Sequence, residues 1–365
     1  MPAIAFPELR WTLLPLLTGS ILLPLASAAQ QPERYAVAGD EVAIYNLAGE
    51  MQVQPGPGPD VIAEATRGGA DAAKLKVVKG EIDGRETLRF LYPSDRILYA
   101  KLSDGSSTQL RVRDDGTFGD NDWDDHGRER RPRGKQITIT RAGGLDAYAD
   151  LRVTVPAGKT VAIYLAVGKV AVTNVSGDLS IDVASAPVAT SNTRGQLDFD
   201  VGSGAVQVTQ ARGDLTVDTG SGTVAASDVR GESVSIETGS GAVTSSDIRS
   251  SELKIETGSG DIQVTNLMAP HVQLETGSGS VSADLNGEVW NVGVQTGSGD
   301  VTLKMPPTIG AEVDIETSSG DIETDFEVAV TRHARDHMTG RIGDGRGKIA
   351  IETGSGGIKL VKGGS

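Results

Sequence analysis

The chain has 365 residues, with 49 acidic against 34 basic side chains and a net charge of −15. This negative balance argues against nucleic acid and against an anionic membrane surface as partners, because phosphate binding needs a basic surface. No cysteine occurs, which excludes disulfides, thiol catalysis and cysteine-ligated metals. Aromatic residues make up only 4% of the chain, so a large core has to be built from Val, Ile, Leu and Ala.

Residues 1–28 have the pattern of a secretory signal peptide. Arg10 precedes an apolar stretch over residues 11–25, and Ala26-Ser27-Ala28 is a small–x–small cleavage site. The stretch is too short for a comfortable membrane span, and two prolines interrupt it. We therefore expect cleavage after Ala28, export of the mature chain, and no membrane span after processing.

Residues 29–160 are expected to form β coils in which a repeat is faint. Strand-like runs lie at 41–45, 74–78, 87–92, 110–112, 136–140 and 151–155, separated by clusters of Gly, Pro and Asp. The segment 114–135 is a charged insertion, in which a run of aspartates is followed by a run of basic residues. Runs of this kind rarely pack, so a mobile loop is expected.

In residues 161–365 a Gly-Ser-Gly turn, or a close variant, recurs at nearly constant spacing. The central serines are Ser203, Ser221, Ser240, Ser259, Ser278, Ser298, Ser319 and Ser355, with steps of 18, 19, 19, 19, 20, 21 and 36 residues. A period near 19 with two strand-like segments per period is typical of a stacked β repeat. Glycine adopts the backbone angles of a tight corner, so we interpret these turns as corners and not as nucleophile or phosphate-binding loops.

Alternation of apolar residues within each repeat predicts an all-β fold, a parallel β-solenoid with about 19 residues per coil. Leu253, Ile255 and Thr257 point to one face of their strand, and Lys254 and Glu256 point to the other. Equivalent residues form two apolar columns, Val217, Ile236, Ile255, Leu274, Val294, Ile315 and Ile351, and Val206, Val224, Val243, Ile262, Val281, Val301, Ile322 and Ile358. Such columns are expected when each strand pairs with its equivalent in the next coil. Threonines at the strand ends, from Thr219 to Thr353, are expected to form a hydroxyl ladder.

The last step of 36 residues is nearly two periods long. We interpret residues 326–348 as an insertion, a divergent coil with an extruded loop, and residues 349–361 as the final coil. A final coil exposes an open edge, and Lys359 and Lys362 are expected to discourage other strands from pairing there.

One outward column is acidic. Its members are Asp218, Glu237, Glu256, Glu275, Glu316 and Glu352, with Gln295 as the neutral member. Because hard cations prefer oxygen ligands, one hypothesis is a linear array for Ca²⁺ or a basic ligand, which would make this a Ca-stabilised surface repeat protein. The alternative, which we favour, is a solvated stripe copied by duplication of the repeat.

Aspartates that follow the turns offer an enzymatic alternative. Asp261, Asp300 and Asp321 each follow a Gly-Ser-Gly-type turn. With Asp300 and Asp321 in adjacent coils, their carboxyl groups would lie about 5 Å apart, the spacing of a retaining glycosidase, so a polysaccharide-active β-helix enzyme is an alternative function. Aspartate is also a common turn residue, and no cluster of Arg, Lys or His accompanies the pair, so we expect no enzyme and no catalytic residue.

Two metal-like patterns are incomplete. Residues 120–125 begin like an EF-hand loop, but Asp125 stands where glycine is needed and Arg131 where glutamate is needed. His333 and His337 are four residues apart, which places both on one face only in a helix, and no helix is expected there. The sequence therefore predicts no metal site and no cofactor.

The phrases IETGSGDIQV, VQTGSGDVTL and IETSSGDIET, with the closing GRIGDGRGKIAIETGSGGIKL, resemble the bacterial β-strand-repeat family labelled "putative adhesin", a domain of unknown function. The resemblance covers residues 35–361 and is strongest from residue 150. It implies an exported, non-catalytic solenoid of a bacterial periplasm or cell surface. The implied role is a binding or envelope scaffold module for a protein or glycan ligand, and no catalytic or ligand-binding residue is transferred.

Overall fold

The computed structural model describes residues 32–102, 106–119, 134–334 and 336–363. The predicted signal peptide, the EF-hand-like residues 120–125 and most of the charged insertion lie outside these residues. Strands dominate, and one turn of 3-10 helix, η1 (Ala72–Lys74), is the helical segment found in the described ranges. Within those ranges no helix reaches the length and apolar character that a bilayer span requires.

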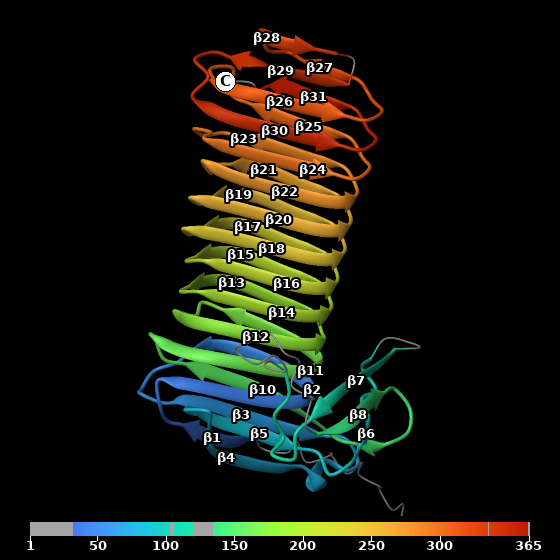
Figure 1. Cartoon of the computed structure of the whole chain (residues 1–365). Helices are drawn as coiled ribbons and strands as arrows, with labels where there is room; N and C mark the ends of the chain where they lie inside the picture. The colour runs from blue at the N-terminus through green and yellow to red at the C-terminus, as the bar shows by residue number, and fades with distance from the viewer. Residues whose placement is uncertain (1–31, 103–105, 120–133, 335, 364–365) are drawn as a thin grey trace, which may run out of the picture. The chain divides into compact units, whose positions relative to one another are not determined.

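The strands form two faces with the apolar core between them (Figure 1). In spatial order the strands of face A are β4 (Lys76–Ile82), β5 (Arg85–Leu91), β2 (Glu41–Pro55), β11 (Lys159–Thr173), β12 (Gly177–Ser185), β14 (Leu197–Ser203), β16 (Leu215–Ser221), β18 (Ser233–Ser240), β20 (Glu252–Ser259), β22 (His271–Ser278), β24 (Asn291–Thr296), β30 (Gly347–Thr353), β26 (Ala311–Thr317), β29 (His337–Ile342) and β28 (Val328–His333).

Face B is built from the second strand of each coil. In spatial order its strands are β1 (Glu33–Val37), β3 (Val61–Gly68), β10 (Tyr148–Val155), the C-terminal parts of β2 and β11, β13 (Val188–Arg194), β15 (Val206–Arg212), β17 (Val224–Arg230), β19 (Val243–Arg249), β21 (Ile262–Leu267), β23 (Val281–Leu285), β25 (Val301–Met305), β31 (Ile358–Lys362) and β27 (Ile322–Thr324). The long strands β2 and β11 continue from one face into the other and join them.

The parallel pairing follows the predicted columns through most of the array. Ile236 pairs with Val217 and Ile255, and Val243 pairs with Val224 and Ile262. Leucine, isoleucine and valine at these positions are buried, and the acidic or polar residues between them face solvent. The predicted all-β, solenoid-like fold is therefore confirmed, and its core is a thin layer of aliphatic side chains.

The strand-end threonines do not form the predicted ladder with one another. The Thr257 hydroxyl donates to the carbonyl oxygen of Gly241 at 3.2 Å, and the Thr276 hydroxyl donates to that of Gly260 at 3.0 Å. Each of these hydroxyls therefore bonds a corner glycine of the neighbouring coil. The predicted ladder is therefore wrong, because the bonded hydroxyls donate to carbonyl oxygens instead of to the next threonine, and the buried hydroxyls of Thr219 and Thr238 have no hydrogen-bond partner among the described residues.

The regular coils also have a second type of corner, which was not predicted from the sequence. Near the end of each regular strand of face B, one residue adopts positive φ; these residues are Asn174, Asn192, Gln210, Asp228, Asp247 and Asn266, with φ from 49° to 58°. Asn and Asp tolerate this conformation better than other residues with a Cβ. At one of these corners Asp228 accepts hydrogen bonds from Arg212 at 2.9 and 3.1 Å, which ties two coils together.

A separate four-stranded sheet covers part of face A near its N-terminal end. It contains β6 (Arg96–Leu98), β7 (Ser107–Val112), β8 (Lys135–Thr140) and β9 (Leu145–Asp146). Beneath it, Tyr45 of β2 stacks on Tyr164 of β11 with 4.2 Å between ring centroids, and Phe118 packs against both edge-on. This second core explains why the outward column of face A is aromatic here and becomes acidic once the cover ends.

The coils at the C-terminal end are not stacked in chain order (Figure 1). Strand β30 pairs in parallel with β24 on one side and with β26 on the other, and β31 pairs likewise with β25 and β27. The last coil of the chain is therefore inserted between two earlier ones. The antiparallel hairpin of β28 and β29, within the predicted insertion 326–348, covers the far side of β26.

This arrangement corrects the prediction that the final coil leaves an open edge. Lys359 does not guard an edge, because its ammonium group lies 3.2 Å from Glu323 of β27. The ammonium group of Lys362 lies 5.5 Å from the centre of the Phe326 ring. Both lysines hold the inserted coil against its neighbour, and β29 supplies the antiparallel strand that ends parallel stacking on face A.

Candidate ligand-binding groove

The acidic column runs along the solvent side of face A. Register places Asp182, Asp200, Asp218, Glu237, Glu256, Glu275, Gln295, Glu352 and Glu316 in one row, in that spatial order. Asp182 and Asp200 extend the predicted column, and Glu352 lies between Gln295 and Glu316 because β30 is inserted there. Neighbouring members stand about 4.8 Å apart, one strand spacing.

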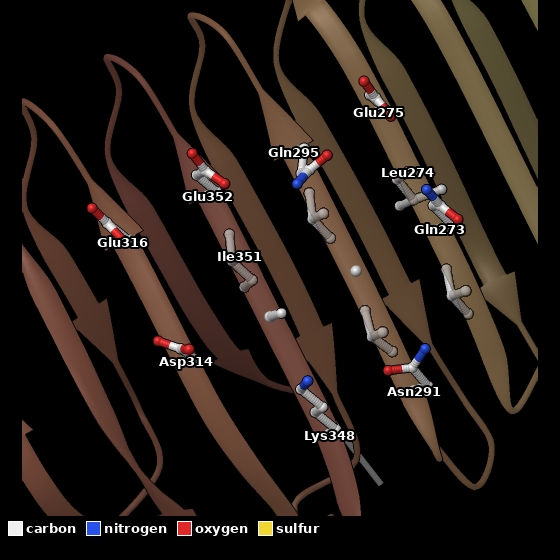
Figure 2. Close-up of a pocket in the computed structure, with 15 residues that line it drawn as sticks. Gln273, Leu274, Glu275, Asn291, Gln295, Asp314, Glu316, Lys348, Ile351 and Glu352 are labelled. Atoms are coloured by element: carbon white, nitrogen blue, oxygen red, sulfur yellow. The ribbon is translucent and has the colours of Figure 1, made fainter.

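At the inserted strand this face is hollowed into a groove of about 340 Å³ (Figure 2). Gln273, Gly293, Ala350 and Asp314 occupy one outward row on four successive strands. The two small residues lie in the middle of this row, so Gly293 and Ala350 form the floor. Gln273 and Asp314 form the two end walls.

Two further rows flank the floor. Figure 2 shows Glu275, Gln295, Glu352 and Glu316 along one side and Asn291 and Lys348 along the other. All of these side chains are exposed, and they rise from rigid paired strands. We call this site, from Gln273 to Asp314 and between these two rows, the Gly293–Ala350 groove.

The charge of the groove is negative. Glu275, Asp314, Glu316 and Glu352 contribute four carboxylates, and Lys348 contributes one ammonium group, which leaves −3. His337 belongs to the hairpin of β28 and β29, here called the cap hairpin, and places its Nε2 atom 3.0 Å from Asp314. Beyond the Gln273 wall the column is already neutralised in part, since Lys254 lies 2.8 Å from Glu256 and this hydrogen bond raises the pKa of Lys254.

An aromatic pair adjoins the groove on its Asn291–Lys348 side. Trp290 directly precedes Asn291 and is 63% exposed, the most exposed large apolar side chain in the described ranges. Its ring lies edge-on to His271 with 6.1 Å between centroids. The Trp290 backbone is fixed on both sides, donating to Pro270 at 2.9 Å and accepting from Lys348 at 2.9 Å.

A family model described as Toastrack DUF4097 matches residues 148–361 of this chain. The chain belongs to this family. The resemblance predicted from the Gly-Ser-Gly repeats, to a bacterial "putative adhesin" domain of unknown function, is thereby confirmed. No curated protein matches the chain at a significant level.

Solved structures similar to this Toastrack protein include three bacterial ones, each named a putative adhesin. The protein from Parabacteroides distasonis has a TM-score of 0.45 at 12% identity, with 90% of this chain and 96% of that chain covered. The protein from Bacteroides fragilis has a TM-score of 0.36 at 12% identity, with the same coverage of 90% and 96%. The protein from Parabacteroides merdae has a TM-score of 0.31 at 10% identity, with coverage of 91% and 97%.

The turn aspartates have a structural role in the Toastrack array. Gly357 of the inserted coil lies between Asp300 and Asp321, so these two residues are not in adjacent coils and stand about two strand spacings, roughly 9.6 Å, apart. The predicted retaining-glycosidase spacing is therefore wrong. The Asp300 carboxylate accepts the Gly357 N–H at 2.8 Å, and the Asp261 carboxylate accepts the Ser280 N–H at 2.8 Å. These carboxylates join successive coils at their corners.

The other residues considered as metal ligands or catalytic groups do not form a site in the Toastrack chain. His333 ends β28 and His337 begins β29, so they lie on two strands of a hairpin and not on one helical face. Among the described residues no three side chains of His, Asp or Glu converge as a metal ion would require. The serines of the Gly-Ser-Gly turns lie at corners, where the glycine after the serine has positive φ from 142° to 154° in seven coils.

Sequence reasoning missed the groove floor and Trp290. A signal was present, since Gly293 and Ala350 occupy an outward slot that Lys254 and Gln273 fill in other coils. Stacking in chain order would place Asp314 between the two small residues. Only the inserted strand makes them neighbours.

Proposed function

We propose that this protein is a non-catalytic, adhesin-like binding module of the bacterial cell envelope. It is exported through the signal peptide of residues 1–28, and its β-solenoid has about 19 residues per coil. The observation that carries the proposal is the Gly293–Ala350 groove, which presents amide, carboxylate and ammonium groups on rigid paired strands. Sites built on strands of a scaffold hold their side chains in place before a ligand arrives.

Binding fits this groove better than catalysis does. Three of its four carboxylates, Glu275, Glu352 and Glu316, lie in one outward row and Asp314 lies in the next, and no base–nucleophile pair is formed among these groove residues. The turn aspartates, the other acidic groups considered for catalysis, are bound to backbone N–H groups of the next coil at Asp261 and Asp300. A shallow groove open to solvent suits a ligand displayed on a surface, either a glycan or a protein.

The test is a binding screen with the protein purified after expression of the full chain. Glycans of defined structure and fractions of bacterial envelope are presented on a surface, and binding is followed by biolayer interferometry. We expect saturable binding to at least one defined glycan or envelope fraction. Absence of saturable binding across the whole screen would overturn the proposal, as would turnover of a bound polysaccharide.

A further inference from the structure

Gly293 is a glycine that the fold does not require. At the corner residues Gly260 and Gly277 an added Cβ would lie 2.2 and 2.5 Å from a carbonyl oxygen of the neighbouring coil, so glycine is obligatory there. At Gly293 nothing lies within 4 Å of that position, and the residue sits in the middle of β24 without positive φ. Glycine inside a strand weakens it and often marks a place where another molecule approaches the backbone. This points to an occupant of the groove independently of its charge.

The charge of the groove selects the occupant. A net charge of −3 repels carboxylated, sulfated or phosphorylated ligands and attracts cationic ones. Glu352 and Glu316 stand on neighbouring strands and Glu275 two strands further along, so the negative charges form a line. Such a line suits an extended molecule with more than one cationic group, since a single small ion would contact only part of it.

The hydrogen-bonding groups of the groove favour a sugar chain over a peptide. The backbone groups of β24 and β30 are already paired within the sheet, so a peptide cannot add to this face as a further strand. The walls instead offer the side-chain amides of Gln273, Asn291 and Gln295, which both donate and accept and so match hydroxyl groups. The exposed Trp290 beside Asn291 offers a flat apolar surface of the kind on which sugar rings stack.

We propose that the Gly293–Ala350 groove binds an amino-sugar chain that carries free ammonium groups. The ammonium groups lie along the row of Glu275, Glu352 and Glu316, and one sugar ring lies over Gly293 and Ala350. This inference rests on the proposed binding function and names the ligand class of that site.

Isothermal titration calorimetry with β-1,4-linked glucosamine oligomers tests the ligand class. The comparison ligand is the fully N-acetylated oligomer of the same length, which keeps the ring and loses the charge. We expect the glucosamine oligomer to bind at least about tenfold more tightly, and its Kd to rise with added salt because screening weakens ionic contacts. Equal affinity for the two oligomers overturns the inference, and tighter binding of an oligolysine of equal charge overturns the choice of a sugar.

Matched variants test the place of binding. Gly293→Thr fills the floor and Glu352→Gln removes one charge of the row, and each is expected to weaken binding of the glucosamine oligomer about tenfold or more. At the same two slots of β18, away from the groove, Ser235→Thr installs the same residue and Glu237→Gln removes the same charge, and both are expected to leave the Kd within about twofold. If Gly293→Thr keeps the thermal melting temperature of wild type, its weaker binding is not caused by unfolding.

The outcomes separate this inference from the proposed function. If the protein binds a glycan or envelope fraction in the screen and neither Gly293→Thr nor Glu352→Gln weakens that binding, the groove assignment is wrong and the binding function stands. If it binds nothing in the screen and no glucosamine oligomer, both are wrong.

Discussion

Two glycine-to-alanine substitutions are expected to change stability in opposite directions. Gly260 has φ of +147°, and an added Cβ would lie 2.2 Å from the Gly241 carbonyl oxygen. A Cβ essentially never lies closer than 3.0 Å to a heavy atom outside its own residue and chain neighbours, so the coils would have to separate by at least 0.8 Å, the difference between these two values. At Gly293 the same methyl group meets nothing within 4 Å.

The expected magnitudes follow from these geometries. Gly260→Ala places a residue with a Cβ in a glycine-only backbone region, which costs about 1–3 kcal/mol. It also strains two inter-coil hydrogen bonds, Gly241 N–H to Ser259 at 2.9 Å and Gly260 N–H to Ser278 at 3.0 Å, each worth about 1 kcal/mol. We expect a loss of about 3–5 kcal/mol in the free energy of unfolding. Gly293→Ala is expected to gain about 0.5–1 kcal/mol, because alanine loses less backbone entropy on folding.

Urea unfolding followed by far-UV circular dichroism measures both effects. Ser259→Ala at the same exposed corner serves as the control and is expected to change stability by less than about 0.5 kcal/mol. Amide hydrogen exchange of Gly241 and Gly279 reports whether the damage is local to the two adjacent coils. The account of the corners is refuted if Gly260→Ala unfolds at the same urea concentration as Ser259→Ala.

Three further substitutions test other parts of the structure. Asn46→Ala removes a fully buried amide that donates to Ala149 at 2.7 Å and accepts from Tyr92 at 2.7 Å, so a loss of about 2–4 kcal/mol is expected in thermal unfolding. Hydrogen bonding to Arg212 lowers the pKa of Asp228, so this pair stabilises the fold above pH 3.8 and the contribution is lost as the pH falls through the lower folded-state pKa. Acid unfolding of Asp228→Asn should therefore show a weaker pH dependence than that of wild type, and unchanged acid unfolding contradicts the assignment. Ile351→Ala in the inserted strand leaves a cavity that is expected to lower the free energy of unfolding by about 2–5 kcal/mol. Limited proteolysis should then cleave the cap hairpin faster than in wild type. An unchanged cleavage rate contradicts a central role for β30.

The regular part of the fold could be predicted from the short-range alternation of apolar residues. The alternation around Ile255 and its repetition at Ile236 and Leu274 determine which side chains are buried and which strands can pair. These are short-range constraints, since a slip by one residue would bring charged side chains into the core. For that reason the columns and the outward acidic row could be read from the sequence.

The order of the last coils could not be read in the same way. Val294 is an equally good partner for Ile315 and for Ile351, because both are isoleucines at the same register. The choice depends on the hairpin of β28 and β29, which covers β26 and prevents a further coil from adding there. The groove was missed for the same reason, since it forms only when Gly293 and Ala350 become neighbours.

The inserted coil also has a consequence for the order of events during synthesis. Residues 311–342 leave the ribosome before residues 347–362, yet among the described strands the parallel partner of β26 is β30. In the final pairing, each new coil adds to the one before it only as far as β24 and β25, because their next neighbours are β30 and β31 and not β26 and β27. Strands β26 to β29 can take their final places only after β30 and β31 have been synthesised and have paired with β24 and β25. A nascent chain without residues 347–362 would therefore expose the strand edges of β24 and β25, which β30 and β31 cover in the finished protein.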